Sequence, residues 1–191
     1  LSRKNIEFAK FALNSIFSTK SISFSSYTLD KQGTYFNNHF GDDPWQAYED
    51  ISIRLLKSTL PNNEILIVIA DHILTPKNIR FEVDVKRRIN DEFKRLAVAG
   101  VCRFDSRSND LSQITDLIIG AINYDLKMQT GLISKPDVYK LEFLKELKTN
   151  LGIENFMSGC KNYIFNIFVD KDIKQRLPFK NVISNEKEPS S

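Results

Sequence analysis

Two aspartates border apolar segments of this chain and are the residues best placed to do chemistry together. Asp71 directly follows the apolar run of residues 65–70, and Asp116 lies about one turn into an apolar helical pattern that begins near Leu111. A buried carboxylate without a partner is very unfavourable, so each acid must be solvated, capped, paired or bound to a metal. One acid at a strand end and another near a helix start are what metal-dependent cleavage of a phosphodiester bond requires. We therefore predict that Asp71 and Asp116 are catalytic and bind Mg²⁺ or Mn²⁺, which prefer hard oxygen ligands.

Both aspartates also have a simpler interpretation as capping residues. Asp71 could cap the turn ahead of residues 75–76. Capping explains Asp116 less well, because a cap at Asp110 or Ser112 would stand before the helix rather than inside it. The catalytic interpretation is therefore stronger for Asp116 than for Asp71.

Basic and polar side chains near these acids could contact a nucleic acid. The helical segment 75–95 carries basic residues that could line one side of a groove and bind phosphates independently of base sequence. Gln113 could orient the Asp116 carboxylate or contact a phosphate, or else complete a capping arrangement with Asp110. The same helix also holds four acidic residues, so a solvated helix with exposed ion pairs is the competing interpretation. The predicted nucleic-acid-binding residues are Arg80, Arg87, Lys94, Arg107 and Gln113.

Composition favours one domain. The 191 residues are 41% hydrophobic, enough for one sizeable core, and a net charge of +3 permits nucleic-acid contact without indicating it. No apolar run reaches the ~20 residues of a membrane span, so we expect no membrane partner. Cys102 and Cys160 form no Cys-x-x-Cys pair, which favours reduced thiols and a cytoplasmic location. We expect one domain over residues 1–170 and a C-terminal tail over 171–191 that is disordered at its end.

Helical and strand patterns alternate along the chain, which predicts an α/β fold with a mixed sheet flanked by helices. Residues 31–43 are polar and rich in Gly, Asn and Asp, as is typical of a loop. The continuous apolar run at 64–70 predicts a central strand that is covered on both faces. The patterns predict helices over 2–17, 44–60, 75–95, 111–128 and 137–149, and strands over 21–30, 64–70, 98–104 and 163–169.

Several of these segments, taken in order, resemble a known family. The segments are Leu29-Asp30-Lys31, Ile-Val-Ile-Ala-Asp at 67–71, Phe104-Asp105-Ser106-Arg107, and Gln113 to Ala121 with Asp116 at its centre. Over residues 1–170 the chain resembles the domain of unknown function 3800 family, which is similar to the ribonuclease H-like (retroviral integrase) superfamily. The resemblance implies a ribonuclease H-like fold and places Ser106 in the catalytic site as a hydrogen-bond donor.

The resemblance also implies a missing acid. Members of that family open with a strand that carries Asp-Glu-Ser-Gly and supplies the first acidic residue, and residues 1–21 contain no such motif. The first strand or strands would then be absent from this chain. Either an upstream segment supplies the acid, or a partner polypeptide supplies it, or this relative has lost it.

Two functions follow as expectations. The first is a divalent-metal-dependent nuclease domain that cleaves DNA or RNA, with a role in phage defence, once the missing acid is supplied. The second is a catalytically inactive interaction or regulatory subunit of a larger assembly. The expected partners are nucleic acid and a protein or upstream segment that completes the site.

Overall fold

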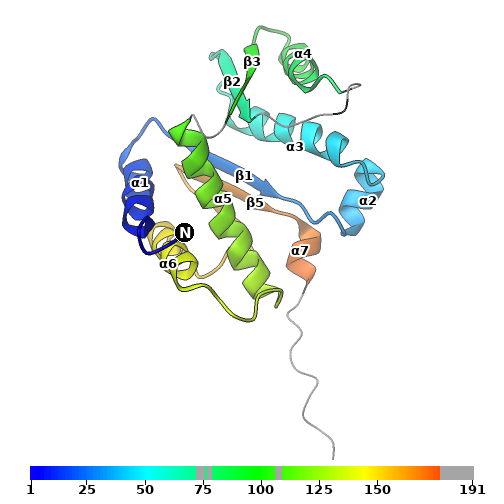
Figure 1. The fold of residues 1–191 in the computed structure, drawn as a ribbon. Helices are drawn as coiled ribbons and strands as arrows, with labels where there is room; N and C mark the ends of the chain where they lie inside the picture. Colours follow the sequence, from blue (N-terminus) through cyan, green and yellow to red (C-terminus); the bar gives the residue numbers. More distant parts are fainter. Residues whose placement is uncertain (72–75, 77–78, 106–108, 177–191) are drawn as a thin grey trace, which may run out of the picture.

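The structure, a computed structural model, describes residues 1–71, 76, 79–105 and 109–176. It is a mixed α/β fold in which small sheets are flanked by helices (Figure 1). The elements in chain order are α1 Ile6–Ser18, β1 Phe24–Thr28, α2 Thr34–Phe40, α3 Pro44–Thr59, β2 Leu66–Asp71, α4 Phe81–Phe93, β3 Val98–Phe104, α5 Asp110–Gln129, α6 Val138–Leu151, β4 Cys160–Lys161, β5 Phe165–Val169 and α7 Lys171–Gln175.

The described strands form two separate sheets rather than the single mixed sheet that the sequence predicted. One sheet has the order β1-β5-β4, with β1 parallel to β5 and the short β4 antiparallel to β5. The other consists of β2 and β3, which are parallel and connected through α4. Since β1 pairs only with β5 and β2 only with β3 among the described residues, each of these two strands has one edge without a strand neighbour.

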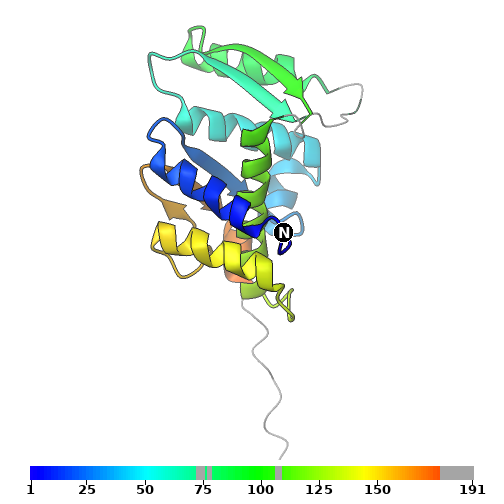
Figure 2. The same ribbon diagram turned by 60° about the vertical axis from the view of Figure 1, so that its left-hand side comes forward.

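The first and larger core lies between the β1-β5-β4 sheet and a group of three helices. Figures 1 and 2 show α1, α5 and α6 together on one side of β1 and β5. Strand side chains alternate between faces, and the buried alternate positions Phe24, Phe165 and Ile167 face this core. Tyr27 lies on the opposite face of β1, where burial raises the pKa of its hydroxyl and the charge of Arg54 of α3 opposes this effect. Helices α5 and α3 therefore lie on opposite faces of β1.

The second core packs α3 and α4 against one face of the β2-β3 sheet. Val85 and Ile89 of α4 are fully buried there, together with Val98 of β3. Along β2, Val68 packs against this core, whereas the side chain of Ile67 is 70% exposed. The expectation that residues 64–70 are covered on both faces is wrong, because α3, which precedes β2, and α4, which follows it, pack on the same face of the sheet.

Helix α2 occupies part of the segment 31–43 that was predicted to be a loop. The backbone N–H of Tyr35, in the first turn of α2, donates to Asp172 Oδ2 at 2.8 Å. Gly33 precedes the helix, and a Cβ atom there would lie 2.2 Å from the same carboxylate oxygen, so only glycine permits this approach. A residue distant in sequence thus caps the helix, and local composition could not predict it.

The C-terminal boundary also differs from the prediction. Helix α7 lies within the segment 171–191 predicted to be a tail, and its Ile173 is buried in the first core. The packed domain therefore continues beyond residue 170.

Helix α4 begins at Phe81, several residues after the predicted start at 75, whereas β3 has the predicted bounds 98–104. Asp43 caps α3 by accepting hydrogen bonds from the N–H groups of Trp45 and Gln46.

Candidate functional site

The two predicted catalytic aspartates line the same groove, which has a volume of about 720 Å³. The groove lies between the two sheets, with β1 on one border and β2 on the other. Helices α3 and α5 contribute its remaining principal walls. The lining residues include Ser23 just before β1, Ser25 of β1, Tyr48, Ser52, Leu55 and Leu56 of α3, Val68 to Asp71 of β2, and Leu111, Ser112, Thr115, Asp116 and Ile119 of α5.

Asp71 reaches the groove because it is the last residue of β2, where the chain leaves the sheet. The carboxyl ends of strands in open α/β sheets are common positions for ligand sites, since the chain turns away there and leaves a crevice. Its side chain is exposed and takes part in interactions within the protein. Asp71 is thus positioned at the groove by the strand that precedes it.

Asp116 lies about two turns into α5, because the helix begins at Asp110. Its side chain is exposed, and among the described residues it has no hydrogen bond or ion pair. Among the described residues, the Asp116 carboxylate is therefore neither a cap nor a member of an ion pair. The buried acid of α5 is Asp125, fully enclosed, which accepts from the N–H of Phe156 at 2.7 Å and pairs with Lys148 at 3.2 Å.

The groove supplies two carboxylates toward a metal site. In the described part of the chain, no group of three or more His, Cys, Asp or Glu side chains could hold a metal ion. Mg²⁺ in proteins is commonly held by one or two carboxylates with water completing the octahedron, so a pair of acids is compatible with weak magnesium binding. A site with two metals would need further ligands.

Tyr48 is the groove residue whose ionisation the structure changes most clearly. Burial raises the pKa of its hydroxyl, the Arg103 charge opposes this effect, and the charges of Asp71 and Glu82 add to it. The hydroxyl therefore stays protonated and able to donate a hydrogen bond at the pH of cells. Its place in the same groove as Asp71 was not part of the sequence prediction.

Gln113 is exposed and is not among the residues that line the groove. The capping arrangement suggested for it with Asp110 is incorrect, because Asn109 caps α5 by accepting from the N–H of Ser112 at 3.1 Å. Ser106 and Arg107 lie outside the described residues, so their predicted roles stay predictions.

The predicted basic surface is partly engaged in contacts within the protein. Arg87 pairs with Asp84 at 2.8 Å, and Arg95 donates to the backbone carbonyls of Glu64 and Pro61. The exposed residues Arg80 and Lys94 have no such partner among the described residues, but they flank opposite ends of α4. The structure therefore does not gather these cations beside the groove.

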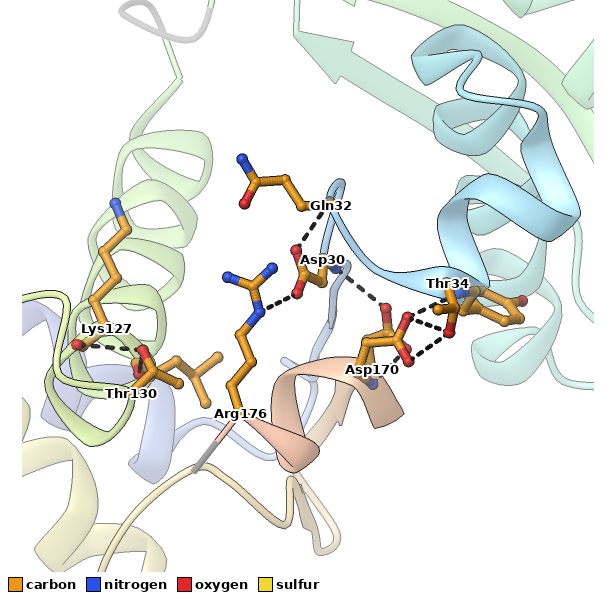
Figure 3. A network of polar contacts seen from close by, with 10 residues as sticks. Asp30, Gln32, Thr34, Lys127, Thr130, Asp170 and Arg176 are labelled. Carbon is orange, nitrogen blue, oxygen red and sulfur yellow. Dashed lines mark hydrogen bonds and ion pairs between the residues drawn. The ribbon is translucent and has the colours of Figure 1, made fainter. Parts of the chain in front are cut away.

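A second acidic cluster, which sequence analysis did not single out, lies at the carboxyl ends of β1 and β5 (Figure 3). Asp170 is 3% exposed and accepts from the backbone N–H groups of Asp30 and Asp172. Asp30 pairs with Arg176 Nε at 2.6 Å, and Asp172 accepts from the Thr34 hydroxyl and the Tyr35 N–H, both in α2. Each carboxylate already has protein donors, so the cluster joins α2, α7 and β1 and has a structural role. The signal in the sequence was Asp170 directly after the apolar strand β5, together with Asp30 two residues after β1.

Three further observations bear on the nature of the protein. Comparison of the chain with protein-family models, with curated proteins and with solved structures found no match. Within the described ranges, no helix combines the length and apolar character needed to cross a membrane. Cys102 and Cys160 are both free thiols, and burial raises the pKa of Cys160.

Proposed function

We propose that this chain is a ribonuclease H-like domain of a divalent-metal-dependent nuclease, with Asp71 and Asp116 as ligands of Mg²⁺ or Mn²⁺. The observation that carries the proposal is that both carboxylates line one groove although 45 positions separate them in sequence. The order β2-α4-β3-α5, with one acid at the end of β2 and the other on α5, also supports it.

In this proposal the protein groups have distinct roles. Asp71 and Asp116 hold the cation, which when bound would supply an activated water and stabilise charge on the phosphate. Tyr48, protonated and lining the same groove as Asp71, donates a hydrogen bond to a phosphate oxygen or to a water in the groove. The resemblance to the ribonuclease H-like superfamily also requires a third carboxylate, which neither Asp71 nor Asp116 supplies.

Metal binding gives the most direct test. Thermal unfolding is measured with increasing Mn²⁺ or Mg²⁺ for the parent and for Asp116→Asn, which keeps the side-chain shape and removes one charge. A ligand that binds only the folded state stabilises it, so the parent melts at a higher temperature with metal and the variant does not. Asp110→Asn is the matched control, since Asp110 is exposed on the same helix but does not line the groove.

Nuclease activity is then assayed on single-stranded and double-stranded DNA and RNA with Mn²⁺. Activity that depends on metal and falls by orders of magnitude in Asp116→Asn supports the proposal, because metal ligands are essential to the reaction. An equal metal-dependent shift in the parent and in Asp116→Asn would contradict the assignment of Asp116 as a ligand.

A non-catalytic interaction subunit is the second candidate, and a specific observation favours it. In the part of the chain that the structure describes, one face of the β2-β3 sheet is uncovered and apolar: Ile67, Ile69 and Phe104, and Ile65 just before β2, are each more than half exposed. Contiguous exposed apolar surface commonly marks an interaction site. Absence of any metal-dependent shift in the parent, together with full folding, would favour this candidate.

A further inference from the structure

The borders of the groove are the unpaired edges of two β-strands. Strand β1 has a strand neighbour only on its β5 side, and β2 only on its β3 side, among the described residues. Residues of both β1 and β2 line the groove, whereas none of β3 or β5 does. The free edges of the two sheets therefore border the same space.

The backbone of β1 shows which groups it presents to this space. The N–H of Phe24 donates to Ile164 at 2.7 Å, and the carbonyl of Thr28 accepts from Asp170 at 3.0 Å, so these residues bond toward β5. In a parallel pair, alternate residues direct both backbone groups toward the same neighbour. The N–H and C=O groups of Ser25 and Tyr27 consequently point away from β5, and Ser25 lines the groove.

The layers that would cover a strand in this position already exist. Helices α5 and α3 lie on opposite faces of β1 and both line the groove. Leu111 and Ile119 of α5 contribute apolar surface, and Leu55 and Leu56 of α3 do the same. An inserted strand would thus meet apolar side chains on both faces, with polar side chains such as Ser52 and Thr115 between them. Strands that are covered on both faces have apolar side chains on both faces.

We propose that the groove binds an extended segment of a partner polypeptide, which adds as a β-strand between β1 and β2 and joins the two sheets. The segment is rich in Val, Ile and Leu and places apolar side chains against both α3 and α5. Main-chain hydrogen bonds to exposed strand edges provide affinity in such strand addition, and the side-chain walls provide selectivity. This inference goes beyond the proposed nuclease function and does not depend on it, because neither a metal nor a nucleic acid takes part.

The experiment uses a fluorescent peptide, Lys-Val-Ile-Val-Ile-Val-Lys with blocked ends, added to the full chain in EDTA. Fluorescence anisotropy measures binding, and hydrogen exchange measures protection of individual amides. The expected results are saturable binding and at least a tenfold slowing of exchange at Ser25 and Tyr27, whose N–H groups face the groove. The N–H of Ser26 faces β5 and serves as an internal reference that does not change.

Two matched controls distinguish strand addition from nonspecific hydrophobic binding of the peptide. The same peptide with N-methyl groups on alternate backbone amides cannot form one set of hydrogen bonds and is expected to bind at least tenfold more weakly. In the protein, Ile119→Arg places a charge in the groove and should weaken binding at least tenfold. Ile67→Arg is its control, because Ile67 is exposed but does not line the groove, and binding should not change.

The proposal would be overturned by three results. These are no saturable peptide binding, equal binding of the N-methylated peptide, and a concentration-dependent dimer without peptide that Ile119→Arg abolishes. The last result would show that a second copy of this chain occupies the groove. EDTA is present throughout, so the peptide experiment involves no metal. A negative result in it does not bear on the proposed metal site, and the absence of metal-dependent stabilisation does not bear on strand addition.

Discussion

The two cores that are built on sheets differ in how completely those sheets are enclosed. The first core packs α1, α5 and α6 against β1 and β5 and contains the largest fully buried side chains, Phe143, Phe156 and Phe165. The second core packs α3 and α4 against only one face of β2 and β3, and leaves the other face apolar and open. The open apolar face belongs to the second core alone, whereas the groove is lined by β1 and α5 of the first core as well as by β2 and α3 of the second.

The largest expected effect on the free energy of unfolding comes from a large-to-small substitution in the first core. Phe143 is 1% exposed and packs among the buried residues of α1, α5 and β5. Phe143→Ala should lower the free energy of unfolding by about 3–5 kcal/mol, because it removes apolar contacts and leaves a cavity. Urea unfolding followed by far-UV circular dichroism measures this change.

The matched substitution in the second core is Ile89→Ala. Ile89 is fully buried between α4 and the β2-β3 sheet, and its truncation should cost about 2–5 kcal/mol of local stability. Hydrogen exchange should then accelerate in β2 and β3 while β1 and β5 keep their protection. Equal acceleration in all four strands would show that the two cores unfold as one unit, which would contradict the distinction between them.

An intermediate effect is expected for the two acids of α5. Asp125→Ala leaves Lys148 and the N–H of Phe156 without their partner, which should cost about 2–4 kcal/mol. Asp116→Ala should change stability by no more than about 0.5 kcal/mol, because the carboxylate is exposed on a helix. Chemical denaturation of both variants without metal measures the difference. A large loss for Asp116→Ala would mean that this acid is structural.

The smallest effect is expected on the open face of β2. Ile67→Ser should change the free energy of unfolding by only about 0.5 kcal/mol or less, since the side chain is already 70% exposed. Val68→Ser, one position along and packed on the second core, should cost more. Size-exclusion chromatography of the parent and Ile67→Ser also shows whether this face causes self-association. A cost for Ile67→Ser equal to that for Val68→Ser would indicate that the open face is covered.

Most elements were predictable because each is set by local patterning. The period of apolar residues located α1, α3, α5, α6 and β3 to within a few residues, and Asp43 and Pro44 marked the start of α3. Helix α2 was missed because its first turn is capped by Asp172, a residue more than 130 positions away. Strand β2 was predicted correctly, but the prediction that both of its faces are covered was wrong, because an apolar run does not indicate how many layers pack on a strand.

The candidate site divides in the same way. The sequence by itself determined that Asp71 would follow a strand and that Asp116 would lie on a helix, because periodicity fixes an element and a residue's place within it. Only the tertiary structure decided that both acids line one groove and that Asp125 rather than Asp116 is the buried acid of α5. It also decided that, among the described strands, the edges beside the groove have no strand neighbour. These properties depend on which helices and strands pack together, and packing joins residues whose separation along the chain carries no local signal.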